Sequence, residues 1–293
     1  MVQQALPRQD SIVALTSALA GVVGRIALPQ EVVKAAQQVL GQAMTLDGGK
    51  LDGATIQNAV RNSGIFQEAM LANGQGKAAG DMKSSLLGLQ RQLGAWLGGQ
   101  APVDQLSKVP PQLKGIIPRA RLAPMAPPDL PDDPELVGKI LLERTEAALS
   151  RMRLHQSASL PDPGAQRNEA QWSLDLPVNL AGQQTLLQMQ IHRDPEGDAT
   201  RPEDRGWQVR FAINLSEAGE VGAQISLRGK ATGVLLWAED AGTADLLSSG
   251  VEALRAELEA VGLMPGAVVV RAGAPSQPVQ QTPRSGNLVD AVS

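Results

Sequence analysis

Apolar residues occupy every second position from Trp207 to Leu215 and again from Val221 to Leu227. A period of two is typical of strands with one buried face, and the short interval between the runs predicts a hairpin. Gly219 stands in that interval and is expected to adopt a positive φ, which other residues resist. Together with other runs of this kind, the pattern predicts strands at residues 171–178, 184–193, 206–215, 221–228 and 232–238.

A helix and a last short strand follow these strands. Apolar residues at helical spacing predict one helix from Thr243 to Val261, and Val268–Val270 predicts a strand. The helix is expected to cover the apolar face of the sheet, including the apolar side of the hairpin. Residues 171–273 are therefore predicted to form an α+β domain, mainly an antiparallel sheet covered by one long helix. The inward positions of that helix are Leu247, Val251, Leu254, Leu258 and Val261.

The first third of the chain repeats its apolar residues at steps of three and four, which is typical of amphipathic helices. Residues 1–98 are therefore predicted to be all-α. Pro29 suits a first helical turn, Gly64 interrupts a helix, and Asp81 is expected to be an N-cap. The clearest apolar stripe consists of Met82, Leu86, Leu89, Leu93 and Trp96.

Eight prolines fall within residues 99–133, a density that helices and central strands do not tolerate. This segment is predicted to be a linker. Asp133 and Pro134 then suit the N-cap and first position of a connecting helix over residues 134–155. The Gln-, Pro- and Ser-rich tail, residues 274–293, is predicted to be disordered.

Composition restricts the function. The formal net charge of −4 and the pI of about 5.3 argue against a nucleic-acid binder, which needs a basic face. The short basic clusters Arg119–Arg121 and Arg151–Arg153 are expected to be solvated. The absence of cysteine excludes disulfides and cysteine nucleophiles.

The apolar segment Ser11–Val23 contains Ala18-Leu19-Ala20, which resembles a signal-peptide cleavage site. Arg8 is balanced by Asp10, however, and the apolar run before that site is short. An amphipathic helix with Ile12, Leu15, Leu19, Val22 and Ile26 on one side is the favoured interpretation, without a cleavable signal peptide. The run is also too short for membrane insertion.

Searches for catalytic or metal-binding patterns fail. His155 and His192 have no second His near them and are expected on the surface. A calcium loop starting at Asp194 would need Gly and Glu where the chain has Ala199 and Arg205. No catalytic, metal-binding or cofactor-binding residue is predicted, so the pattern favours a binding or structural protein over an enzyme.

The order of several short motifs is more informative than any one of them. In the C-terminal half they are Gly219-Glu220-Val221, Trp237-Ala238-Glu239, Leu254-Arg255-x-x-Leu258 and Gly262-Leu263. This order resembles the C-terminal domain of flagellar hook-length control proteins. Ser63–Glu68 and Asp81-Met82-Lys83, before a Leu-rich helix, look like a segment upstream of that domain in long family members. The resemblance covers roughly residues 52–98 and 171–273.

The resemblance implies a function without catalysis or cofactors. Such proteins are cytoplasmic, then exported through the flagellar type III apparatus, and switch export from hook-type to filament-type substrates. The implied partner is the cytoplasmic domain of the export switch protein, with hook or hook-cap subunits as further candidates. The family's hairpin loop carries Pro-x-x-Leu-Gly-x-Val, which aligns with Leu215, Ala218, Gly219 and Val221; Gly and Val match. The implied partner-binding residues are Leu215, Glu217, Ala218, Gly219, Glu220 and Val221.

Two alternatives stay open. One is a structural or adaptor protein that keeps the fold without the switching role, because Leu215 and Ala218 replace the family's Pro and Leu. The other is a hydrolase or transferase built from scattered Asp and Glu, which would need a deep pocket with converging carboxylates of raised pKa.

Overall fold

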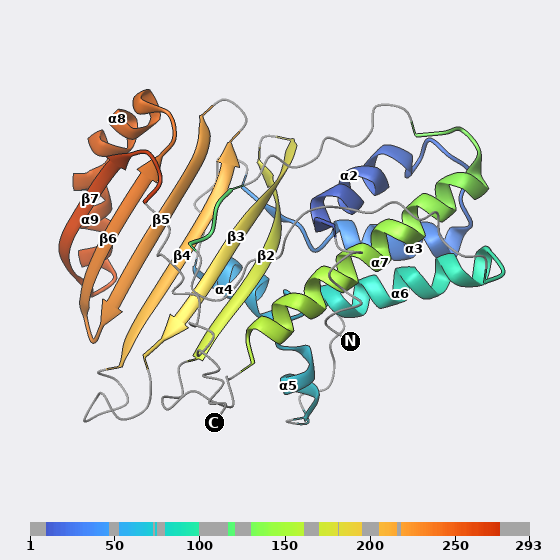
Figure 1. Cartoon of the computed structure of the whole chain (residues 1–293), viewed down its shortest axis with the longest axis horizontal. Coiled ribbons are helices and arrows are strands. Elements are labelled where there is room, and N and C mark those ends of the chain that lie inside the picture. Colours follow the sequence, from blue (N-terminus) through green and yellow to red (C-terminus); the bar gives the residue numbers. More distant parts are fainter. Residues whose placement is uncertain are drawn as a thin grey trace, which may run out of the picture.

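The computed structural model describes residues 10–46, 53–72, 74, 80–99, 117–120, 130–160, 170–180, 182–194, 205–215 and 218–275. Within these ranges, a group of helices lies at one end of a sheet and a pair of helices lies at the other end (Figure 1). The predicted combination of N-terminal helices with a C-terminal α+β part is therefore observed.

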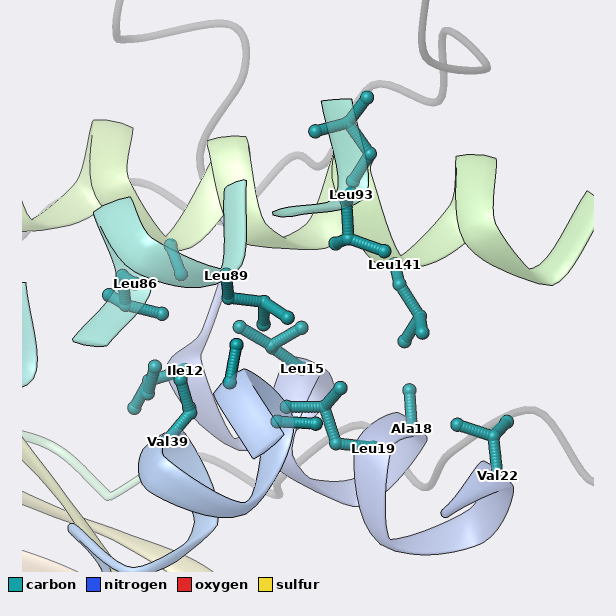
Figure 2. Packing of buried hydrophobic residues seen from close by; sticks show 14 of the residues in the cluster. Ile12, Leu15, Ala18, Leu19, Val22, Val39, Leu86, Leu89, Leu93 and Leu141 are labelled. Carbon is teal, nitrogen blue, oxygen red and sulfur yellow. The ribbon is translucent and has the colours of Figure 1, made fainter. Parts of the chain in front are cut away.

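A four-helix core dominates the N-terminal part. It consists of α2 (Ile12–Val22), α3 (Gln30–Leu40), α6 (Met82–Trp96) and α7 (Pro134–Ala158). Leu15, Leu89 and Leu141 are fully buried in one shared apolar cluster, and Figure 2 shows their side chains meeting between the helices. The predicted stripe on α6 is buried from Met82 to Leu93, and Trp96 is partly buried beside it.

The helix starts follow the predicted caps. Asp81 Oδ1 accepts hydrogen bonds from the backbone N–H groups of Lys83 and Ser84, at 2.9 and 3.2 Å. Asp133 caps α7 in the same way, so both predicted N-caps are confirmed. Pro29 occupies the N-cap position of α3, one residue before the predicted first turn.

Two short helices lie between the larger ones. α4 (Gly53–Arg61) and α5 (Gln67–Ala72) are separated near Gly64, whose φ is 92°. This confirms the predicted interruption at Gly64. A Cβ atom on Gly64 would come within 2.5 Å of the Sδ of Met152 on α7, so glycine also permits a close approach there.

Seven strands within the described ranges pair in sequence order. The five predicted strands are confirmed with equal or slightly wider bounds, and β2 to β6 form an antiparallel meander, which agrees with the predicted mainly antiparallel sheet. β1 was not predicted, and it pairs with β2 in parallel, as β7 does with β6. The strands are β1 (Met44–Thr45), β2 (Ala170–Leu180), β3 (Gln183–Arg193), β4 (Gly206–Leu215), β5 (Gly219–Arg228), β6 (Ala231–Ala238) and β7 (Met264–Ala272).

The two faces of the sheet have different covers. One face, here called the apolar face, packs with α4: Ala59 lies in clusters with Leu174, Met189 and Ile213. The opposite face, here called the bundle face, carries Asp175 on β2 and meets α2 and α7. Directly paired residues project to the same side of a sheet. The register therefore places one row on the bundle face: Asp175, Gln188, Ala212, Gly222 and Trp237.

The single helix predicted for Thr243 to Val261 is wrong. The segment forms α8 (Ala241–Ser249) and α9 (Val251–Ala260), with Gly250 as the C-cap of the first and the N-cap of the second. Glycine weakens a helix interior, which accounts for a break at this position. Burial is also lower than predicted, because Val261 is 72% exposed and the other inward positions are half-buried.

The predicted cover of the hairpin is wrong as well. The helix pair contacts β6 and β7, as expected for a crossover that joins two neighbouring parallel strands. The apolar side of the hairpin meets α4 instead: Val209 and Phe211 pack in one cluster with Val60. The N-terminal helices thus supply part of the core of the C-terminal sheet.

Part of the predicted linker packs against the fold. Ile117 and Leu130 are buried, at 7% and 8% exposure. Residues 100–116, residues 121–129 and the tail from residue 276 onward lie outside the described residues. Within the part of the chain that the structure describes, none of the helices combines the length and apolar character of a membrane span.

Candidate partner-binding site

The hairpin of β4 and β5 ends beside the start of α8. Gly219 pairs with Leu215 and has a φ of 69°, so the predicted positive φ is confirmed. The backbone N–H of Ala218 donates to the Leu215 carbonyl at 3.0 Å. The hydroxyl oxygen of Thr243 on α8 lies 3.5 Å from the Ala218 carbonyl oxygen. The loop therefore lies against the first turn of α8.

Asp240 organises that first turn. It is the N-cap of α8, and its Oδ2 accepts hydrogen bonds from the backbone N–H and the hydroxyl of Thr243, at 2.7 and 3.0 Å. The backbone hydrogen bond from Thr243, followed by the hydroxyl bond, lowers the pKa of Asp240. Beside this turn, a Cβ atom on Gly219 would lie 3.6 Å from Oε2 of Glu239. The hairpin end and the helix start therefore form one continuous surface.

Glu220 points into the molecule. Its side chain is 4% exposed, and it lies on the bundle face, two residues before Gly222. Its Oε1 accepts a hydrogen bond from the indole Nε1 of Trp237 at 3.3 Å. The Nε of Arg119 lies 2.9 Å from Oε1 and 3.1 Å from Oε2. A buried carboxylate is thus matched by one neutral donor and one cation.

The six predicted site residues lie in different surroundings. Leu215 and Val221 are half-buried and pack against the cluster of Met44, Val178 and Ile213. Ala218 and Gly219 have the same intermediate burial and lie at the loop. Glu220 is buried, and Glu217 lies outside the described residues. The described part of the predicted site at the hairpin end is therefore Ala218 and Gly219, next to the α8 turn.

Sequence reasoning missed the residues that support the hairpin. Arg119 was assigned to a solvated basic cluster, and a pairing over a hundred residues away leaves no local signal. Trp237 was noted only as the end of a strand. The smallest residue, Gly222, stands directly opposite the largest, Trp237, in the register, and this pairing could have pointed to their contact.

A second polar group lies where α7 crosses β2. Arg151 Nε donates to Oδ2 of Asp175, and Nε2 of His155 lies 3.1 Å from the same oxygen. All three side chains are at most 7% exposed. The predicted surface position of His155 and the predicted solvation of Arg151 are therefore wrong. α7 is 25 residues long and packs one side against the sheet. Charged residues on that side are buried, and they therefore need a partner of opposite charge on the sheet.

This cluster lacks the features that an acid–base site requires. Burial alone would raise the pKa of Asp175, but the charges of Arg151 and His155 and their hydrogen bonds outweigh burial and hold the pKa well below its usual range. Burial raises the pKa of Asp81, yet its Oδ1 is engaged in capping α6. The described residues also contain no group of three or more His, Cys, Asp or Glu side chains that could hold a metal ion. The converging carboxylates of raised pKa that a hydrolase would need are not found in this part of the chain.

The meander, the crossover helix pair and the N-terminal helices together define an α+β protein. Residues 195–279 match the family model of the flagellar hook-length control protein FliK. The matched segment contains β4 to β7, α8 and α9, so it includes the hairpin but not β2 or β3. This segment is thus similar to a domain of that family, which agrees with the resemblance that the sequence motifs indicated. No match was found among curated proteins or solved structures.

Proposed function

We propose that this chain is a non-enzymatic flagellar hook-length control protein that switches the substrate specificity of type III export. The observation that carries the proposal is the family match over residues 195–279, which contains the hairpin and its α8 neighbour. In this proposal the loop around Gly219 contacts the cytoplasmic domain of the export switch protein. Hook or hook-cap subunits are further candidate partners. The protein acts in the cytoplasm and is then exported through the flagellar apparatus.

The proposal is tested by binding and by phenotype. The full chain is expected to bind the purified cytoplasmic domain of the export switch protein in isothermal titration calorimetry. A strain lacking this gene is expected to make hooks of uncontrolled length, and the chain should reach the culture medium when flagellar export is active. Absence of binding together with normal hooks would reject the proposal.

An adaptor with the same fold but no switching role is the second candidate. It is favoured by the inward position of Glu220 and by the packing of Leu215 and Val221, which leave few side chains at the loop for a partner. Leu215 and Ala218 also stand where the family's motif has Pro and Leu. For an adaptor, Leu215→Pro combined with Ala218→Leu should leave hook length unchanged. For a switch protein, the same change should alter hook length.

Gly219→Val is expected to weaken binding to the export switch domain by at least about tenfold. Valine resists a φ of 69°, at a cost of about 1–2 kcal/mol, so the loop must change its backbone path. Space is not the obstacle, because the nearest atom would lie 3.6 Å from the new Cβ. The measurement is the dissociation constant, with a thermal melt to follow stability.

Gly229→Val is the matched control. Gly229 has a φ of 57°, has no atom within 4 Å of its Cβ position, and lies at the opposite end of β5. It should therefore destabilise the fold to a similar degree while leaving binding unchanged. Equal binding by the two variants would show that the loop at Gly219 is only a connection and that the partner surface lies elsewhere.

A further inference from the structure

A short piece of the proline-rich segment lies against the bundle face next to the hairpin. This piece, Ile117–Ala120, is here called the strap (Figure 1, the short green trace crossing the sheet). Ile117 and Pro118 are buried, whereas Arg119 keeps 49% of its side chain exposed while its Nε reaches Glu220. The strap thus occupies the surface directly behind the loop of the candidate site.

The strap has the form of a bound peptide. It contains neither helix nor strand. Pro118 has a fixed φ, and the residue before a proline prefers an extended conformation. The strap therefore presents an apolar residue and, two positions later, an arginine, along an extended backbone. Such segments commonly dock on other proteins through a few side-chain anchors.

Glu220 makes this surface selective for a cation. Its carboxylate is buried, and Trp237 supplies only one neutral hydrogen bond. Among the described residues, Arg119 is the cation that pairs with Glu220. A buried carboxylate without a cation is costly, so any segment that replaces the strap must bring a positive charge to the same place.

We infer that the strap is an exchangeable internal ligand of a peptide-docking surface whose specificity residue is Glu220. The external ligand is an extended segment of a partner protein with an apolar residue two positions before an arginine. Because the strap belongs to the same chain, its effective concentration is of millimolar order, and it keeps the surface closed until such a segment competes. Contact with the partner at the loop would then be coupled to displacement of the strap.

The strap itself indicates the chemistry of the partner segment, and only the identity of the partner protein rests on the proposed function. Peptide exchange can be measured without any flagellar component. A chain that exchanges peptide but does not bind the export switch domain would keep this inference and reject the proposed function. The reverse result would reject the inference alone.

The probe is a fluorescein-labelled peptide with the sequence of residues 115–121, Gly-Ile-Ile-Pro-Arg-Ala-Arg. It is titrated against the full chain and against the full-length variant Ile117→Ser/Arg119→Gln, with fluorescence anisotropy as the readout. The variant, whose own strap has lost both anchors, should bind the peptide at least about tenfold more tightly than the wild-type chain. A peptide with glutamine in place of the arginine that corresponds to Arg119 should bind at least about tenfold more weakly than the unchanged peptide.

Two controls keep the test decisive. Arg228→Gln removes a more exposed arginine at the far end of β5 and should not increase peptide binding. The indole N–H signal of Trp237 in a ¹⁵N NMR spectrum, one of four indole signals, reports the neighbourhood of Glu220 and should move when the peptide binds. If the double variant fails to fold, Arg119→Gln alone replaces it, because this change removes the cation and keeps the buried Ile117 anchor. The inference would be overturned if the wild-type chain and the strap variant bound the peptide equally tightly. It would also be overturned if the glutamine peptide bound as tightly as the unchanged peptide.

Discussion

Asp175→Asn is expected to lower the free energy of unfolding by about 3–5 kcal/mol, because it leaves the buried guanidinium of Arg151 without its counter-charge. The two side chains are 7% and 3% exposed, so water cannot replace the lost interaction. Oδ1 of Asp175 and Nη1 of Arg151 already have no hydrogen-bond partner among the described residues. The cluster therefore has little capacity to rearrange, and urea unfolding measures the loss.

Two comparisons separate the buried charge from other effects. Asp194→Asn removes a carboxylate that pairs with Arg228 near the surface, and it should cost no more than about 1 kcal/mol. Arg151→Met should cost less in the Asp175→Asn background than in the wild-type chain, because the uncompensated charge has then been removed. Additive losses, or a loss below about 1 kcal/mol for Asp175→Asn, would contradict this account of the cluster.

The same carboxylate predicts a pH dependence. The folded pKa of Asp175 lies well below its unfolded value near 3.8. Below that value the unfolded chain binds the proton more readily than the folded chain does, so the stabilisation falls as the pH falls. The quantity to compare is the stability difference between the wild-type chain and Asp175→Asn. Below pH 4 it should shrink, which unfolding curves at several pH values would show.

Local patterns were sufficient where one short segment determines the structure. The alternation from Trp207 to Leu215 predicted β4 and its neighbours, and the caps at Asp81 and Asp133 predicted two helix starts. The positive φ of Gly219 was predicted from its place between two strands. In each of these cases, the residues within a few positions contain the physical cause.

The errors concern contacts between distant segments. The pairing of His155 and Arg151 with Asp175 depends on how α7 crosses β2, which no local pattern contains. The break at Gly250 was missed because the apolar spacing continues across it and outweighed the weak helix propensity of glycine. The contact of α4 with the hairpin, and that of Arg119 with Glu220, likewise join segments far apart in the chain. The candidate loop was thus predictable from its own residues. The contacts that support the loop, from α4 and from Arg119, were not.

Trp237→Ala is expected to lower the free energy of unfolding by about 3–5 kcal/mol. It should also abolish the proposed binding of the export switch domain at the hairpin loop. The indole is fully buried on the bundle face, next to Gly222, and donates to Glu220. Removing it leaves a cavity in the sheet face and takes one of the two described partners from a buried carboxylate. Trp237→Phe keeps a six-membered ring and leaves a smaller cavity, so it should cost less than Trp237→Ala, through the smaller cavity and the lost hydrogen bond together.

A double-mutant cycle of Gly222 and Trp237 tests whether the packing of these two residues is coupled. A Cβ atom on Gly222 would lie 2.2 Å from Cζ2 of Trp237, so Gly222→Ala should cost about 1–3 kcal/mol in the wild-type chain through overpacking. In the Trp237→Ala background the added methyl group enters the cavity, and the same change should cost little or even stabilise the fold. Equal costs in both backgrounds would mean that the indole and Gly222 do not constrain each other. A strong coupling would show that the absence of a side chain at Gly222 is what allows Trp237 to reach Glu220 and support the hairpin from behind.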